Sequence, residues 1–388
     1  MRVILKKYKI CVVVASRANY GRIKSVLVAL DKSDEVELQL ILGASTLLER
    51  FGSAIDVIKQ DGFNPVRTIH YIVEGETLST QAKSTGLGII ELATAFEDLK
   101  PDLVVTVADR FETMSTAIAA TYQNIKLAHI QGGEVSGNID DRVRHAITQL
   151  ADIHFPCTEE SLRRVISMGA NTKHSYNYGC PAMDIISQIN TKLDINKLRS
   201  RYTNLGLEID WSRPYILMLQ HPVTTSYGSG FRQVLETLNA LNEIKDFQKL
   251  VLWPNIDAGS DHVSKGIRTF REEEDAKDFA YFMNFSPEDY VRVLANASCC
   301  VGNSSSFIRE CSFLGTPSVI VGDRQKGREV GMNVIYSDYK RDDIKKGILS
   351  QLDNGKFPAD YRFGRGDAGI RIANQLLEEL KNNESLSS

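Results

Sequence analysis

Short apolar runs alternate with amphipathic helical patterns along almost the whole chain. The run at 9–15, KICVVVA, precedes YGRIKSVLVALD, where the i, i+3, i+4, i+7 spacing of one buried helix face is filled by Ile23, Val26, Leu27 and Leu30. The same order returns around VELQLILG, LVVTV, KLAHI, PYILMLQHP and PSVIVG. Strands that are apolar throughout are typical of parallel sheets covered by helices on both faces. We therefore predict an α/β fold with doubly wound sheets.

A polar stretch at about 190–213 interrupts this alternation, which then resumes. At 388 residues, the chain is longer than a single hydrophobic core usually spans. Two series of strands and helices separated by a polar break therefore predict two Rossmann-like domains. We place the N-terminal domain at 1–190, the C-terminal domain at 210–360 and a final amphipathic helix in 361–388.

The charge balance argues against nucleic-acid and membrane partners. The chain carries 46 basic and 49 acidic residues, a formal net charge of −3. No apolar run approaches the ~20 residues of a membrane helix. The six cysteines form no C-x-x-C pair, which is typical of reduced core thiols, and the seven histidines show no metal-ligand spacing. We therefore expect a cytoplasmic protein.

Three segments that follow predicted strands are suited to binding anions, because ligands of open α/β sheets bind beyond the carboxyl ends of the strands. Arg17 follows the first strand, the serine-rich segment 302–306 follows another and opens a helix, and a third is followed by Arg324 and Arg328. Arginine binds phosphate in a bidentate manner, and a helix N-terminus offers free N–H groups. Taken singly, Arg17 also suits a helix cap, and 302–306 suits a capping segment. Together these segments predict a diphosphate site in a cleft between the domains.

Acidic residues gather after two strands of the first domain. Asp109 and Arg110 follow one strand directly, and the next strand is followed by Glu134, Asp140, Asp141, Arg144 and His145. The Gly-Gly pair before Glu134 allows a sharp turn that would direct the carboxylate over the sheet edge. Asp140 and Asp141 also suit the N-terminus of the helix that they open. His221 ends the first strand of the second domain, where it would face the cleft.

Acids beside a diphosphate site predict proton transfer on a sugar, and therefore a nucleotide-sugar site. The chain has neither a Walker A motif nor a strand–GxGxxG–helix fingerprint, which argues against P-loop NTPases and dinucleotide enzymes. It has no DxD motif, and the arginines already supply positive charge for the phosphates. We therefore expect neither a metal nor another cofactor.

Six motifs together resemble the hydrolysing UDP-N-acetylglucosamine 2-epimerases, which include bacterial enzymes of sialic-acid synthesis and the epimerase half of the human bifunctional enzyme. The motifs are SRANYGRIKS, ADRFET, HIQGGEVSGNIDDRVRHAI, HPVT, PNIDAGS and VGNSSSFIRECSFLGTPSVIVGDRQKGR. They occur in order from residue 16 to about 328, so the resemblance covers nearly the whole chain. It implies a glycosyltransferase-B-like fold, in which two Rossmann-type domains face a cleft and the last helix packs back on the first domain.

The resemblance also implies roles for single residues. The implied diphosphate ligands are Arg17, Ser304, Ser305 and Arg324, and Glu310 would bind the ribose hydroxyls. The residues implied to be needed for activity are Asp109, Glu134, Asp140, Asp141 and His221. Asn255 would lie near the sugar or the phosphates. We also count among the substrate-binding residues Asn19, Arg110, His145 and Asn303.

The implied reaction releases UDP from UDP-N-acetylglucosamine through a glycal intermediate and gives free N-acetylmannosamine for nonulosonic (sialic) acid synthesis. Many family members have aspartate where this chain has Asn19, a departure that could mark a different sugar. The alternative substrate is a 2,4-diacetamido-2,4,6-trideoxy-hexose nucleotide of legionaminic acid synthesis. Other readings are a non-hydrolysing epimerase, a glycosyltransferase of the same fold and a non-catalytic sensor. We expect a homodimer or homotetramer.

Overall fold

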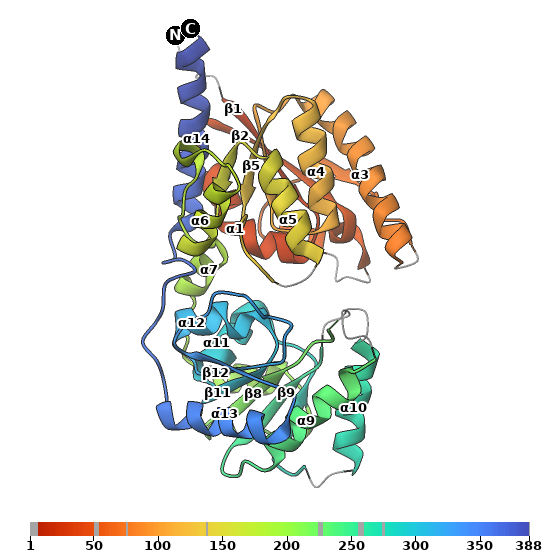
Figure 1. Ribbon diagram of the computed structural model, residues 1–388, viewed down its shortest axis with the longest axis vertical. Coiled ribbons are helices and arrows are strands. Elements are labelled where there is room, and N and C mark those ends of the chain that lie inside the picture. Colours follow the sequence, from red (N-terminus) through yellow and green to blue (C-terminus); the bar gives the residue numbers. More distant parts are fainter. Residues whose placement is uncertain are drawn as a thin grey trace. The chain divides into compact units, whose positions relative to one another are not determined.

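The chain forms two compact units, each built around its own β-sheet (Figure 1). The first unit consists of Met1–Ser187 together with Arg362–Ser388, and the second of Gln188–Tyr361. The computed structural model describes residues 7–49, 54–74, 77–136, 139–223, 228–254, 260–273 and 276–387.

The sheet of the first unit is parallel throughout its described strands, in the order β3-β2-β1-β4-β5-β6. Its strands are β1 (Tyr8–Val14), β2 (Val36–Gly43), β3 (Arg67–Ile69), β4 (Leu103–Val107), β5 (Lys126–Ile130) and β6 (Ile153–Phe155). Chain order reverses between β1 and β4, and in open α/β sheets ligands bind at such a point, beyond the carboxyl ends of the strands.

Helices join and cover the strands of this unit. They are α1 (Arg17–Asp31), α2 (Ala54–Gln60), α3 (Leu78–Leu99), α4 (Phe111–Tyr122), α5 (Ile139–Leu150), α6 (Glu159–Ser167), α7 (Ala182–Gln188) and α14 (Ala368–Ser387), with the short 3₁₀ helices η1 (Ala44–Leu47) and η3 (Thr172–His174).

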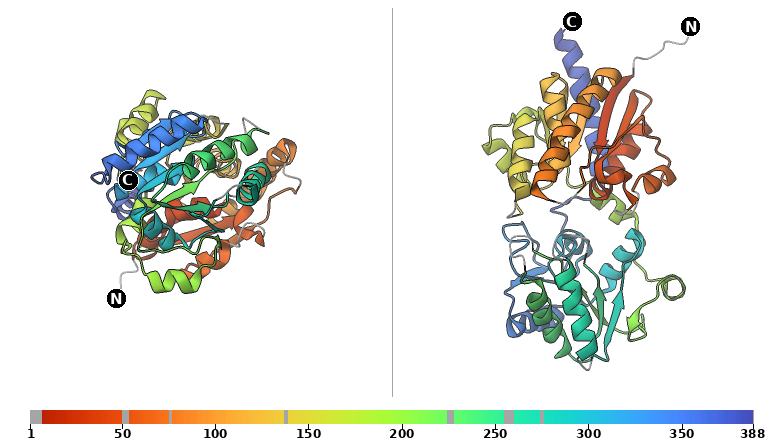
Figure 2. Two further views of the ribbon diagram at one scale, coloured as in Figure 1. Left: turned by 90° about the horizontal axis from the view of Figure 1, so that it is seen from below. Right: turned by 90° about the vertical axis from the view of Figure 1, so that its right-hand side faces the viewer.

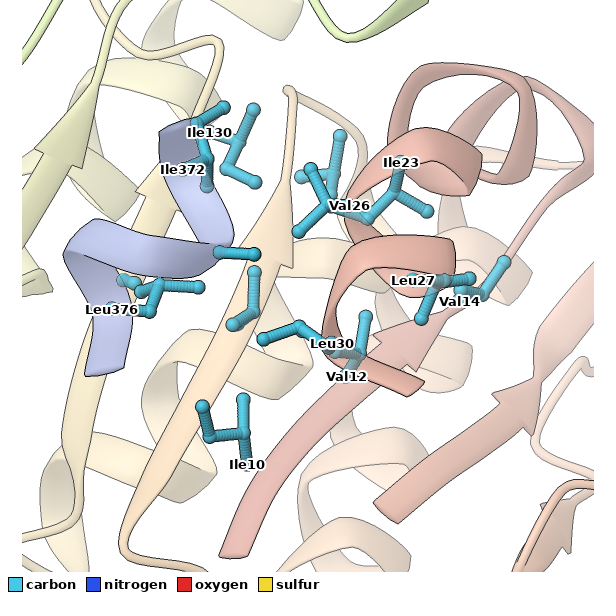
Figure 3. Packing of buried hydrophobic residues seen from close by; sticks show 14 of the residues in the cluster. Ile10, Val12, Val14, Ile23, Val26, Leu27, Leu30, Ile130, Ile372 and Leu376 are labelled. Atoms are coloured by element: carbon cyan, nitrogen blue, oxygen red, sulfur yellow. The ribbon is translucent and has the colours of Figure 1, made fainter. Parts of the chain in front are cut away.

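The first strand is buried on both faces, because successive side chains enter two different cores. Ile10, Val12 and Val14 pack with side chains of α1 and α14, as Figure 3 shows. Cys11 and Val13 point the other way and pack with side chains of α3, α4 and α5. Cover on both faces explains why this strand reads as a continuous apolar run.

The C-terminal segment returns to the first unit. Asp184 of α7 accepts hydrogen bonds from the backbone N–H groups of Ala368 (3.0 Å) and Gly369 (2.6 Å), where α14 begins. Ile372 and Leu376 then pack in the same core as the α1 side chains (Figure 3). Strand β1 and helix α14 therefore share one core, although they come from opposite ends of the chain.

The second unit has a parallel sheet with one antiparallel edge strand, in the order β13-β12-β11-β8-β9-β10-β7. The strands are β7 (Leu205–Gly206), β8 (Tyr215–Leu219), β9 (Gln248–Leu252), β10 (Phe279–Phe282), β11 (Cys299–Gly302), β12 (Ser318–Val321) and β13 (Val334–Ser337). The helices are α8 (Ile195–Arg201), α9 (Gly230–Asn242), α10 (Ser260–Glu273), α11 (Pro287–Asn296), η5 (Ser305–Phe307), α12 (Arg309–Leu314) and α13 (Arg341–Asn354). Chain order reverses between β8 and β11.

The predicted fold class is confirmed, because both units are doubly wound α/β layers with parallel sheets. The polar stretch at 190–213 is not structureless: it supplies α8 and β7, and β7 pairs antiparallel with β10. Among the described residues, no helix combines the length and the apolar character that crossing a membrane requires.

Candidate functional site

In the first unit, a buried arginine joins the acidic segments that follow β4 and β5. Arg144 of α5 has a side chain only 1% exposed. It donates hydrogen bonds to the carboxylate of Asp109, to Asp141 Oδ1 (2.6 Å) and to the backbone carbonyl of Glu134 (2.6 Å). We call Asp109, Glu112, Glu134, Asp140 and Asp141, with Arg110 and Arg144, the acid cluster. Its members come from three segments that are separate in sequence.

The backbone is left-handed directly after β4 and β5, the two strands that precede the acid cluster. Ala108 (φ 68°) and Gln131 (φ 66°) are non-glycine residues with positive φ, directly after β4 and β5. His129 Nε2 donates to the Ala108 carbonyl (2.9 Å), and burial lowers the pKa of His129 to about 3, so its imidazole is neutral. A Cβ on Gly133 (φ 76°) would meet the backbone oxygen of Ser161. The turn before Glu134 therefore requires this glycine.

Asp141 fixes the loop that carries Glu134. Its Oδ1 accepts hydrogen bonds from Ser136 N (2.8 Å) and Ser136 Oγ (2.7 Å), in addition to the bond from Arg144. Glu134 itself is 8% exposed. A carboxylate with this many donors is held in one position, so Asp141 fixes Ser136, two residues after Glu134.

Asp140 has a different environment from its neighbour. Burial, and then the charge of Asp109, raises the pKa of Asp140 to about 6, while Arg110 and Arg144 oppose this shift. The carboxyl group therefore exchanges its proton close to neutral pH, a property that suits a group in proton transfer.

Asp140→Asn is expected to flatten the pH dependence of stability between about pH 4 and pH 6. The folded state raises the pKa of Asp140 from 3.8 to about 6, so it binds this proton more tightly than the unfolded chain does. The contribution of Asp140 to the free energy of unfolding therefore falls as pH rises through this window and stays lowered above it. Asparagine has no proton to lose, so the variant gains relative stability as pH rises.

Thermal unfolding of the two proteins at a series of pH values measures this difference. Asp342→Asn, at an aspartate whose side chain is 87% exposed, is the matched control. If the Asp140→Asn and wild-type melting temperatures change in parallel across the window, the shifted proton does not belong to Asp140.

Glu112 and Arg144 belong to the cluster, although the sequence analysis assigned neither a role. Glu112 is 1% exposed, and burial raises the pKa of its carboxyl group. Arg110 Nε lies 3.2 Å from Glu112 Oε1, at the start of α4. A sequence signal existed for both residues, since Glu112 lies within ADRFET and Arg144 within the DDRVRHAI stretch. The sequence alone does not show that these two side chains are buried.

The start of α1 follows β1 at the point where chain order in the sheet reverses, between β1 and β4. Ser16 caps this helix by accepting from Asn19 N (3.2 Å), and Arg17 is exposed in the first turn. Asn19 is 3% exposed and donates through Nδ2 to the carbonyl of Val107 (3.4 Å), the last residue of β4. A carboxylate has no hydrogen for this bond. Asn19 thus ties α1 to the strand end that precedes Asp109.

His145 follows Arg144 on α5 and is partly buried. Its Nδ1 has no hydrogen-bond partner within the described part of the chain, and burial, aided by the Arg144 charge, lowers its pKa. The imidazole is therefore mainly neutral near pH 7.

In the second unit, Asn303 joins the ends of β8 and β11. His221 N donates to Asn303 Oδ1 (2.7 Å), and Asn303 Nδ2 donates back to the His221 carbonyl (2.9 Å). The Asn303 carbonyl accepts from Arg324 Nη1 (3.1 Å) and Gln325 Nε2 (3.0 Å), which follow β12. We call His221, Asn303, Arg324 and the serines 304–306 the β8–β11 site. Its parts meet where chain order in the sheet reverses.

His221 is neutral in this site. It is 4% exposed, and burial, followed by the nearby charge of Arg324, lowers its pKa to about 3. A Cβ on Gly302 (φ 138°) would collide with the Leu219 carbonyl, so β11 approaches β8 closely only because this position is glycine.

The serine segment forms a compact polar turn. Ser304 Oγ lies 2.9 Å from Ser306 Oγ, which in turn lies 2.6 Å from the hydroxyl of Tyr290. The segment does not open one continuous α-helix, as the sequence pattern predicted, because the short η5 and α12 are separated at Ile308. Glu310 lies in the first turn of α12, which ends at Gly315 (φ 67°).

The structure collects many of the predicted residues into one group in each unit, whereas Arg17, Asn19, His145 and Glu310 are not members of either group. Asp109, Arg110, Glu134, Asp140 and Asp141 meet in the acid cluster, whereas the β8–β11 site contains His221, Asn303, Ser304, Ser305 and Arg324. Asn255 lies outside the described residues. Within the described ranges, no group of three or more His, Cys, Asp or Glu side chains is arranged to hold a metal ion.

Comparisons with known proteins concern nearly the whole chain. A family model described as UDP-N-acetylglucosamine 2-epimerase matches residues 28–377. The UDP-N-acetylglucosamine 2-epimerase of Neisseria meningitidis serogroup B is 28% identical over 97% of this chain and 95% of that protein. The UDP-N,N'-diacetylbacillosamine 2-epimerase (hydrolyzing) of Legionella pneumophila is 32% identical over 96% of each.

Solved structures share the fold at lower sequence identity. UDP-GlcNAc 2-epimerase from Neisseria meningitidis bound to UDP-GlcNAc has a TM-score of 0.77 at 17% identity, covering 95% of this chain and 100% of that one. The Methanocaldococcus jannaschii UDP-GlcNAc 2-epimerase in complex with UDP-GlcNAc and UDP has a TM-score of 0.76 at 18% identity, covering 95% and 99%. These likenesses confirm the predicted glycosyltransferase-B-like fold class.

Proposed function

Because the chain belongs to the UDP-N-acetylglucosamine 2-epimerase family, we propose that it is an epimerase of the hydrolysing type. It would convert UDP-N-acetylglucosamine and water into free N-acetylmannosamine and UDP, in nonulosonic (sialic) acid synthesis. The observation that carries the proposal is the acid cluster, in which Arg144 holds Asp109, Asp141 and the segment of Glu134. A protein that only binds a nucleotide sugar requires no such group of buried and half-buried carboxylates.

The chemistry explains why two kinds of site are needed. The proton on carbon 2 of the sugar is not next to a carbonyl group, so a carboxylate alone cannot remove it. Breaking the anomeric C–O bond first sends its electron pair to the diphosphate and gives the ring oxocarbenium character, which acidifies that C–H bond. Loss of the proton forms a glycal. Water then adds its oxygen at carbon 1, and a proton is delivered to carbon 2 from the opposite face.

We assign the proton transfers at carbon 2 to Asp109 and Glu134. Asp140, whose pKa is raised to about 6, suits activation of the water or of a sugar hydroxyl. Asp141 and Arg144 act as positioning residues through the bonds described above. The other proposed substrate-binding residues on this side are Asn19, Arg110 and His145, and Asn255 would lie near the sugar or the phosphates.

We propose that cationic and hydroxyl groups bind the departing diphosphate. The proposed ligands are Arg17, Ser304, Ser305 and Arg324, and Glu310 is the proposed ribose ligand. His221, neutral because burial lowers its pKa, would donate a hydrogen bond to the phosphate rather than a proton. Asn303 would position His221 and Arg324, since both of its amide atoms already bond the His221 backbone.

A second candidate substrate is a nucleotide-linked 2,4-diacetamido-2,4,6-trideoxy-hexose. Asn19 favours it, because a buried neutral amide stands between β1 and β4 where many family members have a carboxylate. The Legionella pneumophila relative, whose name specifies UDP-N,N'-diacetylbacillosamine, agrees with this alternative. The two candidates differ in the substituents at carbons 4 and 6, and the chemistry at carbons 1 and 2 is the same.

Product identification separates these possibilities. The protein is incubated with UDP-N-acetylglucosamine, and in parallel with the UDP and GDP forms of the diacetamido sugar, and the products are identified by NMR. We expect free 2-epimerised sugar and nucleoside diphosphate from one of them. A nucleotide-linked epimer would indicate a non-hydrolysing enzyme, and an intact donor in every reaction would favour a glycosyltransferase or a sensor.

We also propose a cytoplasmic location and a homo-oligomer. All six cysteines are buried, as expected for small core side chains. Nucleotide sugars carry charged diphosphates that do not cross membranes unaided. We therefore expect the enzyme in the compartment where its substrate is made, which we propose to be the cytoplasm.

A further inference from the structure

The ring of Tyr339 lies directly over the backbone of Gly322 in the second unit. Gly322 follows β12 and has a φ of 75°, and its N–H donates to the carbonyl of Ser337 (2.8 Å), the last residue of β13. A Cβ added at Gly322 would overlap Cζ, Cε2 and the hydroxyl oxygen of Tyr339. Glycine is therefore required here both for its backbone conformation and for the ring that covers it. Strand β12 and helix α13, between which this segment runs, belong to the second unit (Figure 1), which Figure 2 shows from two further sides.

Tyr339 also reaches the β8–β11 site. Its ring packs against the core of the second unit. Burial, and then the charge of Asp323, raises the pKa of Tyr339 to about 12, whereas the Asn303 side chain and the charge of Arg324 oppose this shift. These groups therefore lie near the hydroxyl, but within the described residues none of them is placed to form a hydrogen bond with its oxygen, which is buried. The side chain is therefore held by the packing of its ring and not by a polar contact.

The segment around β13 fastens the loop after β12 at two points. The loop begins at Gly322, beneath the Tyr339 ring, and the Gln325 carbonyl accepts a hydrogen bond from the hydroxyl of Tyr336 (3.0 Å). Arg324 lies between these two points, and its guanidinium is part of the β8–β11 site. An arginine whose backbone is fixed on both sides loses less conformational entropy when its guanidinium binds a ligand.

We propose that Tyr339 is a positioning residue for Arg324. Its ring holds the backbone at Gly322, which keeps the Arg324 guanidinium at the β8–β11 site, where it would meet the diphosphate. The inference rests on the proposed function, which assigns Arg324 to the diphosphate, and it adds the group that orients this arginine. Tyr339 acts through the loop and not by contact with the nucleotide, because the protein covers its hydroxyl.

Tyr339→Ala removes the ring and should weaken binding of the phosphates alone. The dissociation constants of UDP and of uridine are measured by calorimetric and NMR titration, or those of GDP and guanosine if the chain prefers that carrier. We expect the dissociation constant of the diphosphate to rise about 10-fold, because a charged hydrogen-bond donor is displaced, and that of the nucleoside to stay at the wild-type value. Tyr339→Phe keeps the ring and should bind both ligands as the wild type does.

Phe247→Ala is the matched control. Phe247 is another partly buried aromatic residue packed against the same core, but it precedes β9 at the amino end of the sheet, opposite the site. Its loss should lower the free energy of unfolding without changing the affinity for UDP or uridine. Tyr339→Leu keeps apolar bulk but not the ring, so it provides the same comparison if Tyr339→Ala does not fold.

A double-variant cycle tests whether Tyr339 acts through Arg324. In the Arg324→Ala background, Tyr339→Ala should cause no further loss of diphosphate affinity. Losses that multiply, an equal loss for UDP and uridine, an unchanged diphosphate affinity without the ring, or a Tyr339→Phe variant as weak as Tyr339→Ala would each overturn the inference and leave the proposed function in place. A wild-type chain that binds neither UDP nor GDP would instead contradict the proposed function, and this inference with it.

Discussion

Glu134→Gln is expected to lower kcat by about 10²–10⁴ and to leave the affinity for UDP nearly unchanged. Glutamine has the shape of glutamate but cannot take or give the proton at carbon 2. The local backbone should persist, because Arg144 donates to the backbone carbonyl of residue 134 and Ser136 N donates to Asp141. The change therefore removes proton transfer without removing the fold.

Turnover measured by UDP release, together with calorimetric titration of UDP, separates these two quantities. Glu37→Gln makes the same chemical change at an exposed position on β2 and should leave both quantities at the wild-type value. If Glu134→Gln retains wild-type kcat, Glu134 does not take part in the reaction. If it loses turnover and UDP affinity equally, its role is structural.

Arg324→Ala is expected to lower kcat/KM by about 10²–10³, with part of the loss in kcat. In the proposed mechanism the anomeric C–O bond breaks early, so negative charge develops on the departing phosphate, where this guanidinium would stabilise it. Arg324 also donates to the Asn303 carbonyl, but Gln325 donates to the same oxygen and would continue to hold that loop.

Lys326→Ala is the matched control, because it removes a positive charge from an exposed side chain of the same loop. Steady-state kinetics of both variants and UDP titrations measure the effect. We expect the loss in kcat/KM to exceed the loss in UDP affinity for Arg324→Ala, and neither to change much for Lys326→Ala. Equal effects in the two variants would mean that Arg324 contributes only to the general charge of the loop.

The parts of the fold that the sequence predicted follow from local patterns. Continuous apolar runs at β1, β8 and β12 require cover on both faces, and the i, i+3, i+4, i+7 spacing in α1 predicts the face that packs against β1. Polar residues directly after strands predicted both groups of site residues, because parallel strands bring their carboxyl ends to one edge of the sheet.

Other features depend on contacts between distant segments, which local patterns do not reveal. Arg144 was visible in the sequence, but its bonds to Asp109 and Glu134 span 35 and 10 residues. Asn303 was expected to bind substrate, and its bonds to His221 span 82 residues. The left-handed Ala108 and Gln131 have no sequence signal, since neither is a residue type that favours positive φ.

The most direct test of the central claim is the reaction run in D₂O and followed by NMR. If the chain is a hydrolysing 2-epimerase, the free 2-epimerised sugar and the nucleoside diphosphate appear in equal amounts, and the sugar carries deuterium at carbon 2. A free sugar with hydrogen retained at carbon 2, or an epimer still linked to its nucleotide, would contradict the account.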